Sequence, residues 1–143
     1  MRGYRDSIRY SLDGGVLIAL ALGEKFTENL RESILRGEVE AFTSQIALIE
    51  MMYILCRKTG WKIAENKKNS LLFSRMIHIV PLEELLDEVA KIKCERRISL
   101  ADCCTIALAR IYNCKALFVK KERELEEEMK RKPFDIEIEF LTE

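Results

Sequence analysis

The segment IRYSLDGGVLIALAL, residues 8–22, decides the fold class because it joins a strand to a helix through an acidic turn. Residues 8–12 alternate in polarity, as strand residues do, and Asp13-Gly14-Gly15 interrupts that alternation. The following residues, 16–22, are all apolar, which predicts a short helix. We therefore expect a strand, a turn that carries a carboxylate, and a helix.

The alternation of strands and helices continues along most of the chain. Further strands are predicted at residues 40–43, 77–80, 116–119 and 136–141. Further helices are predicted at residues 25–36, 44–58, 61–75, 82–93, 99–112 and 122–130. Proline and glycine are sparse and no segment resembles a linker. This order predicts an α/β fold, a three-layer α/β/α sandwich around a mainly parallel sheet, in a single domain over residues 1–143.

The charge balance limits the ways in which the chain can bind nucleic acid. Lys plus Arg and Asp plus Glu each total 24, so the net charge is zero. A neutral protein does not hold nucleic acid by bulk electrostatic attraction. A nuclease whose acidic site is neutralised by bound cations remains compatible with this balance.

The cysteines and the N-terminus favour a cytoplasmic protein. The five cysteines are an odd number without a Cys-x-x-Cys pair, and the single histidine, His78, leaves no plausible zinc spacing. We expect all five thiols to be free and buried in a reducing compartment. No apolar run is long enough to span a bilayer, and residues 1–6 do not resemble the start of a secretory signal.

Three acidic residues occupy positions where a solvated acid is not expected. Asp13 follows the first strand, Glu50 lies within an apolar helical segment, and Asp102 opens an otherwise apolar helix. Each also has a structural interpretation. Asp13 can cap the next helix, Glu50 can lie on a solvated stripe, and Ser99 with Asp102 matches a helix capping box.

The joint placement of these acids favours a metal site. In a parallel α/β sheet, ligands bind beyond the carboxyl ends of the strands, and all three acids are predicted to lie near that edge. Carboxylates gathered in one crevice repel one another unless a divalent cation lies among them. Such a cluster suits Mg²⁺ or Mn²⁺ and can activate a water for attack on phosphorus.

The order of these motifs resembles the PIN-domain family, which includes the toxin ribonucleases of toxin–antitoxin pairs. The resemblance is carried by residues 12–20, 44–50, 99–102 and 116–119, and it covers nearly the whole chain. It implies a parallel sheet flanked by helices, and it implies hydrolysis of single-stranded RNA by metal-activated water. It also implies a homodimer and, for toxin members, a small antitoxin that blocks the site. The ligands that it implies are Asp13, Glu50 and Asp102.

Two positions depart from the family pattern. Family members usually carry Thr or Ser directly after the first acid, where this chain has Gly14. They usually carry Thr-x-Asp after the fourth strand, where this chain has Lys120-Lys121-Glu122, so Glu122 would replace the fourth acid. These departures favour an alternative, a catalytically weak PIN domain that serves as an RNA-binding or protein-assembly module.

Two further possibilities concern RNA contacts and a different chemistry. Five basic residues flank the Glu50 helix, and Trp61 is available for stacking, although a solvated helical hairpin also explains them. The basic residues are Arg57, Lys58, Lys62, Lys67 and Lys68. An aspartyl-phosphate phosphatase needs a second acid two residues after the nucleophilic aspartate, and Gly15 occupies that position.

Overall fold

The computed structural model describes residues 7–143 of the chain. Residues 1–6, on which the expectation about a secretory leader rests, lie outside the described residues. Within residues 7–143, no helix combines the length and the apolar character that a membrane-spanning segment needs.

The centre of the fold is one five-stranded sheet with the strand order β3-β2-β1-β4-β5. The strands are β1 (Ile8–Leu12), β2 (Val39–Ser44), β3 (Ile77–Val80), β4 (Lys115–Phe118) and β5 (Ile138–Phe140). All four strand pairings are parallel, so the carboxyl ends of the strands lie at the same edge. At that edge Leu12 is in register with Thr43 on one side and with Leu117 on the other.

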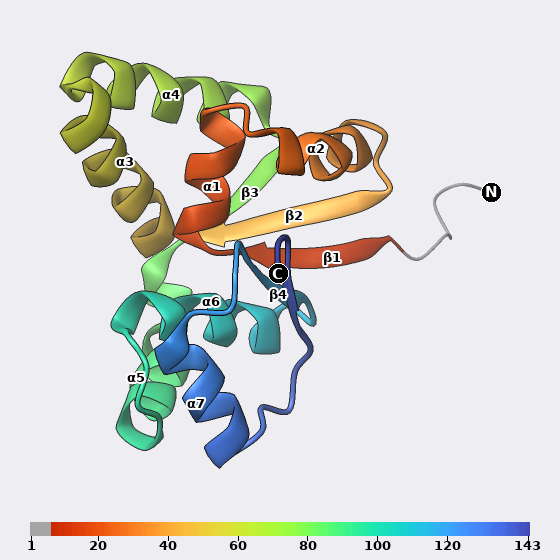
Figure 1. Cartoon of the computed structure of the whole chain (residues 1–143), viewed down its shortest axis with the longest axis vertical. Coiled ribbons are helices and arrows are strands. Elements are labelled where there is room, and N and C mark those ends of the chain that lie inside the picture. Colours follow the sequence, from red (N-terminus) through yellow and green to blue (C-terminus); the bar gives the residue numbers. More distant parts are fainter. Residues whose placement is uncertain (1–6) are drawn as a thin grey trace.

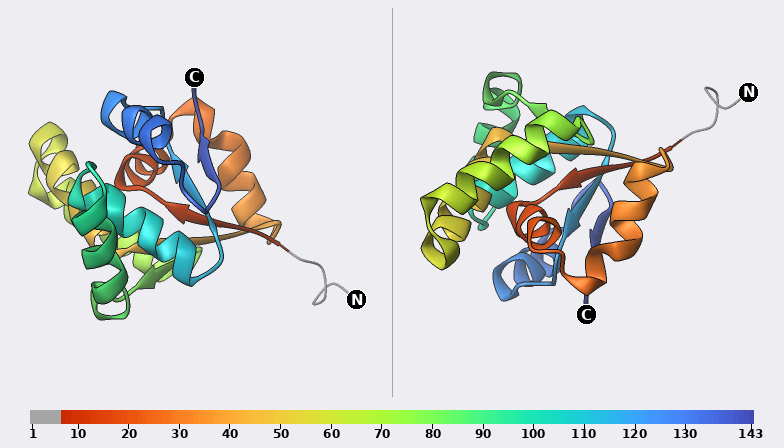
Figure 2. Two further views of the ribbon diagram at one scale, coloured as in Figure 1. Left: turned by 90° about the horizontal axis from the view of Figure 1, so that it is seen from below. Right: turned by 90° about the horizontal axis from the view of Figure 1, so that it is seen from above.

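The helices form a layer on each face of the sheet, which confirms the predicted three-layer α/β/α architecture (Figure 1). Four helices cover one face: α1 (Gly14–Ala21), α2 (Glu28–Leu35), α3 (Gln45–Thr59) and α4 (Trp61–Ser74). Three cover the other: α5 (Leu86–Glu95), α6 (Leu100–Ile111) and α7 (Arg123–Arg131). The view from below places the second group in front of the sheet, and the view from above places the first group in front (Figure 2).

Alternation along the strands distributes apolar side chains between two cores. Ala41 and Leu117 pack with α1 to α4, whereas their neighbours Phe42 and Phe118 pack with α5 to α7. Successive strand residues point to opposite faces, so a strand covered on both sides is apolar at nearly every position. This explains the continuous apolar run at residues 116–118 of β4, an inner strand that has neighbours on both sides.

Two predicted helices are interrupted near their starts. The predicted helix 82–93 begins as the 3₁₀ helix Leu82–Glu84, breaks at the fully buried Leu85, and continues as α5 to Glu95. The predicted helix 25–36 likewise begins as the 3₁₀ helix Lys25–Thr27 before α2. In both, tighter i to i+3 hydrogen bonds form the first turn, and apolar periodicity does not distinguish these from α-helical ones.

Most predicted boundaries agree with the structure to within two residues, and one prediction about burial is wrong. The last strand is shorter than predicted, because pairing with β4 holds only Ile138–Phe140. All five cysteines are free, as expected, but Cys94 is exposed and Cys56 is only partly buried. Cys94 lies in the last turn of α5, beyond the apolar contacts that bury Ile92.

Candidate metal centre

Asp13 is fixed at the carboxyl edge of the sheet by its own backbone and side chain. Its N–H donates to the carbonyl of Leu117 at 3.0 Å, which continues the β1–β4 pairing by one residue. Its Oδ2 accepts from the N–H of Gly15 at 3.1 Å and so caps α1, as the sequence predicted. Capping satisfies one helix donor and leaves other carboxylate lone pairs free for a ligand.

Glu50 reaches the same edge from α3 and lies against Gly14. A Cβ atom added to Gly14 would lie 2.1 Å from Glu50 Oε1 and 3.0 Å from Glu50 Cδ. Non-bonded heavy atoms do not approach to 2.1 Å, so no larger residue fits at position 14 unless the Glu50 side chain moves. The space that the side chain of a Thr or Ser would fill after Asp13 is therefore occupied by the side chain of Glu50.

Asp102 enters from the other helix layer, in the first turn of α6. Ser99 caps this helix, and its Oγ accepts from the N–H of Asp102 at 3.1 Å, as the capping-box pattern predicted. The half-buried carboxylate therefore lies at the positive end of the helix dipole. Structural and functional interpretations of Asp102 are compatible, because the cap uses the backbone N–H and leaves the carboxylate available.

Thr105 is a residue of the site that the sequence analysis missed. This residue is 1% exposed and lies one turn beyond Asp102, and its hydroxyl helps to lower the pKa of the Asp13 carboxyl. The same hydroxyl donates to the carbonyl of Ala101 at 3.3 Å. Ser11 Oγ donates to the Thr105 carbonyl at 2.8 Å, which holds α6 against β1. The only signal in the sequence is one polar residue on a buried helix face.

The start of α7 brings two further acids toward the centre. Glu122 is the residue before the first turn of α7; it is exposed, and its charge helps to raise the pKa of Asp13. Glu124, which the sequence analysis did not single out, helps to raise the pKa of Asp102. Lys121 forms no ion pair among residues 7–143, and its Nζ lies 5.4 Å from the centre of the Phe140 ring.

Burial and mutual repulsion raise the pKa values of all three predicted ligands. Burial is the largest cause for Asp13, for Glu50 and for Asp102. The charge of Asp13 also raises the pKa of Glu50, and Asp13 and Glu50 together help to raise that of Asp102, which reaches about 7. These effects place the three carboxylates within electrostatic reach of one another.

No cationic side chain neutralises this cluster within the described part of the chain. None of the ion pairs formed among residues 7–143 includes Asp13, Glu50 or Asp102. Half-buried carboxylates without a cationic partner are unfavourable, and oxygen ligands of this kind suit Mg²⁺ or Mn²⁺. The donor chemistry therefore fits a divalent cation.

The acidic side chains at this edge do not converge on one point as a complete set of metal ligands would. Among residues 7–143, no three His, Cys, Asp or Glu side chains stand close enough together to hold a metal ion. Mutual repulsion of carboxylates opposes such convergence, and the side chains of Glu50 and Glu122 have several rotatable bonds. A cation at this edge would therefore require side chains such as Glu50 and Glu122 to rotate toward the fixed Asp13.

The family assignment follows from the order of these elements and from a direct match. A family model described as the PIN domain matches residues 10–127, which include all four acids of the predicted site. The chain belongs to the PIN domain family. This assignment confirms the resemblance on which the sequence analysis relied. No match appears among curated proteins.

Solved structures share the fold of this PIN domain at low sequence identity. VapBC2 from Rickettsia felis, bound to a DNA fragment from its promoter, is 16% identical with a TM-score of 0.68, over 93% of this chain and 98% of that chain. VapC20 from Mycobacterium tuberculosis, a toxin that cleaves the sarcin–ricin loop, is 16% identical with a TM-score of 0.59, over 75% and 86%. A toxin–antitoxin complex from Klebsiella pneumoniae is 14% identical with a TM-score of 0.55, over 78% and 86%. At these identities the likeness concerns the fold.

Proposed function

We propose that this PIN domain is a divalent-metal-dependent endoribonuclease that hydrolyses single-stranded RNA. The observation that carries the proposal is the cluster of Asp13, Glu50 and Asp102. These carboxylates have raised pKa values and form no ion pair among the described residues. They lie at the carboxyl edge of a parallel sheet, where ligands of such folds bind.

The proposed roles follow from how firmly each side chain is held. Asp13 is the fixed ligand, because β4 and the first turn of α1 both bond to it. Asp102 would approach from the opposite helix layer, and Glu50 and Glu122 would complete the set by rotating inward. A bound Mg²⁺ or Mn²⁺ would polarise the phosphate and lower the pKa of a water molecule.

The RNA strand would approach over the end of α3 and the start of α4. Arg57 and Lys58 lie about two turns beyond Glu50 on α3, roughly 10 Å along its axis. Trp61, at the start of α4, is 54% exposed and can stack on an unpaired base. Local basic residues of this kind are compatible with a zero net charge.

The biological role that we propose is that of a toxin with a small antitoxin partner. The supporting observation is the shared fold with VapC20 and with two VapBC-type or toxin–antitoxin complexes. We further propose that the protein is a cytoplasmic homodimer and that residues 1–143 form one domain. All of these proposals rest on the family assignment and on the shared fold.

The alternative is a PIN domain that binds RNA or assembles with proteins but cleaves weakly. Two observations favour it: Gly14 removes a hydroxyl from the site, and no three ligand side chains converge among residues 7–143. The unpaired acids favour the enzyme, because a binding module has no need for three half-buried carboxylates without cationic partners.

Cleavage of a labelled single-stranded RNA tests the proposal. Wild type, Asp13→Asn and Asp87→Asn are purified side by side, the last as a matched loss of an exposed acid at the start of α5. We expect Mn²⁺- or Mg²⁺-dependent cleavage by wild type and Asp87→Asn, and a loss of about 100-fold or more in Asp13→Asn. Equal cleavage by all three preparations would indicate a contaminating ribonuclease. Folded wild type that binds RNA but does not cleave it would favour the binding module.

A further inference from the structure

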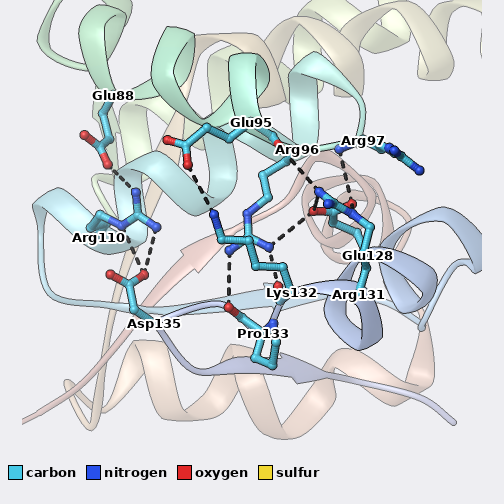
Figure 3. Close-up of polar contacts among 10 residues, drawn as sticks. All are labelled: Glu88, Glu95, Arg96, Arg97, Arg110, Glu128, Arg131, Lys132, Pro133 and Asp135. Atoms are coloured by element: carbon cyan, nitrogen blue, oxygen red, sulfur yellow. Dashed lines mark hydrogen bonds and ion pairs between the residues drawn. The ribbon is translucent and has the colours of Figure 1, made fainter.

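Glu128 is a fully buried acid that the proposed reaction does not use. It lies in α7 and is 2% exposed. Its carboxylate accepts from Arg131 Nη2 at 2.8 Å and Nε at 3.0 Å, from Arg96 Nη1 at 3.2 Å and from the N–H of Arg97 at 3.3 Å (Figure 3). Arg131, then Arg96 and the Arg97 N–H, hold the pKa of Glu128 at about 2. We call these four residues the Glu128 network.

The Glu128 network joins two segments that are far apart in the sequence. Arg96 and Arg97 belong to the connection between α5 and α6, whereas Glu128 and Arg131 belong to the last turns of α7. Arg96 also donates to the carbonyls of Lys132 and Pro133, the latter at 3.2 Å. Its guanidinium lies 3.9 Å from the centre of the Phe134 ring. The side chain of Arg96 is 8% exposed, so it is almost completely enclosed.

Both joined segments lead directly to acids of the candidate metal centre. Two residues after Arg97 comes Ser99, the cap of α6, whose Oγ accepts from the N–H of Asp102. Six residues before Glu128 comes Glu122, about 9 Å away along α7. The network therefore fixes the start of α6 relative to α7, on either side of the site.

Such a bond network is better suited to fixing geometry than to adding stability. Buried ion pairs gain little over well-packed apolar residues, because removing charges from water is costly. Two of the four donors, Arg96 Nη1 and the Arg97 N–H, reach the Glu128 carboxylate from the other segment, and they restrict the relative position of the two segments. Repulsion between Asp102 on α6 and Glu124 on α7 acts between the same two helices.

We infer that Glu128 is a positioning residue for the proposed metal site, because it holds the Asp102 end of α6 against the helix that begins beside Glu122. This inference rests on the proposed function for the identity of the site. Outer partners that orient metal ligands change metal affinity by about 10- to 100-fold when removed. An effect of this size is expected although Glu128 itself contacts no ligand.

The test compares Glu128→Gln with Glu88→Gln as a matched control. Glu88 on α5 pairs with Arg110, which also donates to Asp135 at 2.8 Å. This second network, of Glu88, Arg110 and Asp135 (Figure 3), anchors the last turn of α6. Asp102 lies in the first turn of α6, about 12 Å away along the helix. Each variant removes one negative charge: Glu128→Gln removes it from the network beside the start of α6, and Glu88→Gln from the network at the end of α6.

Two measurements are made on each folded protein below its unfolding transition. The affinity for Mn²⁺ is measured by electron paramagnetic resonance, and hydrogen exchange is measured for amides 99–104 without metal. We expect Glu128→Gln to weaken Mn²⁺ binding about tenfold or more and to speed exchange at these amides. Glu88→Gln is expected to stay within about twofold of wild type in both. Arg131→Lys, which keeps the charge but loses the two-point contact, gives an intermediate change and replaces Glu128→Gln if that variant does not fold.

The outcomes separate this inference from the proposed function. Wild-type affinity and exchange in Glu128→Gln would overturn the positioning role, as would equal losses in Glu88→Gln. Wild type that binds no Mn²⁺ would contradict the proposed function instead. In that case the exchange data alone decide whether Glu128 fixes the start of α6.

Discussion

The Glu50 carboxylate lies against Gly14 so closely that a Cβ atom on residue 14 would be 2.1 Å from Glu50 Oε1. The glycine at position 14, which departs from the family pattern, therefore fits together with the position of the Glu50 side chain. A glycine after Asp13 allows α3 to deliver its carboxylate to the edge of the sheet beside Asp13. A hydroxyl from another element, that of Thr105 on α6, helps to lower the pKa of Asp13.

This contact predicts that restoring the usual hydroxyl at position 14 is harmful. We expect Gly14→Ser to lower the free energy of unfolding by about 1 kcal/mol, because Glu50 must move into a poorer position. Mn²⁺ affinity should fall with it. In a Glu50→Ala background most of the destabilisation should disappear, since the colliding atoms are gone. Urea unfolding of the four proteins in this double-mutant cycle measures the coupling, and simple additivity would contradict the account.

The raised pKa of Asp102 predicts how stability depends on pH. Burial first, and then the charges of Asp13 and Glu50, raise this pKa from 3.8 to about 7. Between these values the folded state binds more protons than the unfolded state, so ionisation of Asp102 destabilises the fold. We expect the stabilising contribution to be complete below pH 4 and lost as the pH rises through about 7.

Asp102→Asn isolates this contribution from those of other groups. Urea unfolding of the metal-free proteins from pH 4 to 8 should show a smaller loss of stability in the variant than in wild type. Parallel curves would mean that Asp102 titrates normally. Glu128 does not affect this comparison. Its lowered pKa changes the stability of both proteins in the same way, and mainly below pH 4.5.

Thr105 predicts a difference between two conservative substitutions. Thr105→Val keeps the shape but removes the hydroxyl that lowers the pKa of Asp13, and Thr105→Ser keeps the hydroxyl. We expect Val to cost about 1 kcal/mol in the free energy of unfolding and to reduce Mn²⁺ affinity severalfold. Ser should retain most of the affinity. Calorimetric titration decides the matter, and similar affinities for Val and Ser would assign Thr105 to packing alone.

Trp61 predicts a direct optical signal for RNA binding. It is the only tryptophan in the chain, it is 54% exposed, and basic residues flank it on α3 and α4. In the Asp13→Asn variant, which should not cleave, single-stranded RNA is expected to quench its fluorescence. The quenching should weaken as salt increases, because the neighbouring contacts are to phosphates. If a duplex of the same sequence quenches equally, stacking on unpaired bases is not the mode of binding.

The order of strands and helices could be predicted because two periodicities dominate the chain. The apolar run at residues 116–119, the mostly apolar strand at 77–80 and the amphipathic helices between them favour a sheet covered on both faces. The 3₁₀ turn at Leu82–Glu84 could not be predicted, since the same apolar spacing fits a helix that starts at residue 82, four residues before α5. Cys94 was predicted buried from its type, but its position at the end of α5 exposes it.

The candidate site was only partly accessible from the sequence. Asp13, Glu50 and Asp102 stood out because acids are unusual in apolar surroundings, and the structure places them within electrostatic reach of one another. That they bind metal, with Glu122, stays a prediction. Thr105 gave no comparable signal, because threonine is common in buried helices. The pairing of Gly14 with Glu50 depends on how two helices pack, which no local pattern encodes.

The central claim is that the cluster around Asp13 binds a divalent cation, and Mn²⁺ titration followed by electron paramagnetic resonance tests it most directly. The proteins compared are wild type, Asp13→Asn, and Asp87→Asn as the exposed-acid control. The account predicts saturable binding by wild type and Asp87→Asn, with an affinity at least about tenfold lower in Asp13→Asn. Wild type that binds no Mn²⁺, or Asp13→Asn that binds it as well as wild type does, would contradict the account.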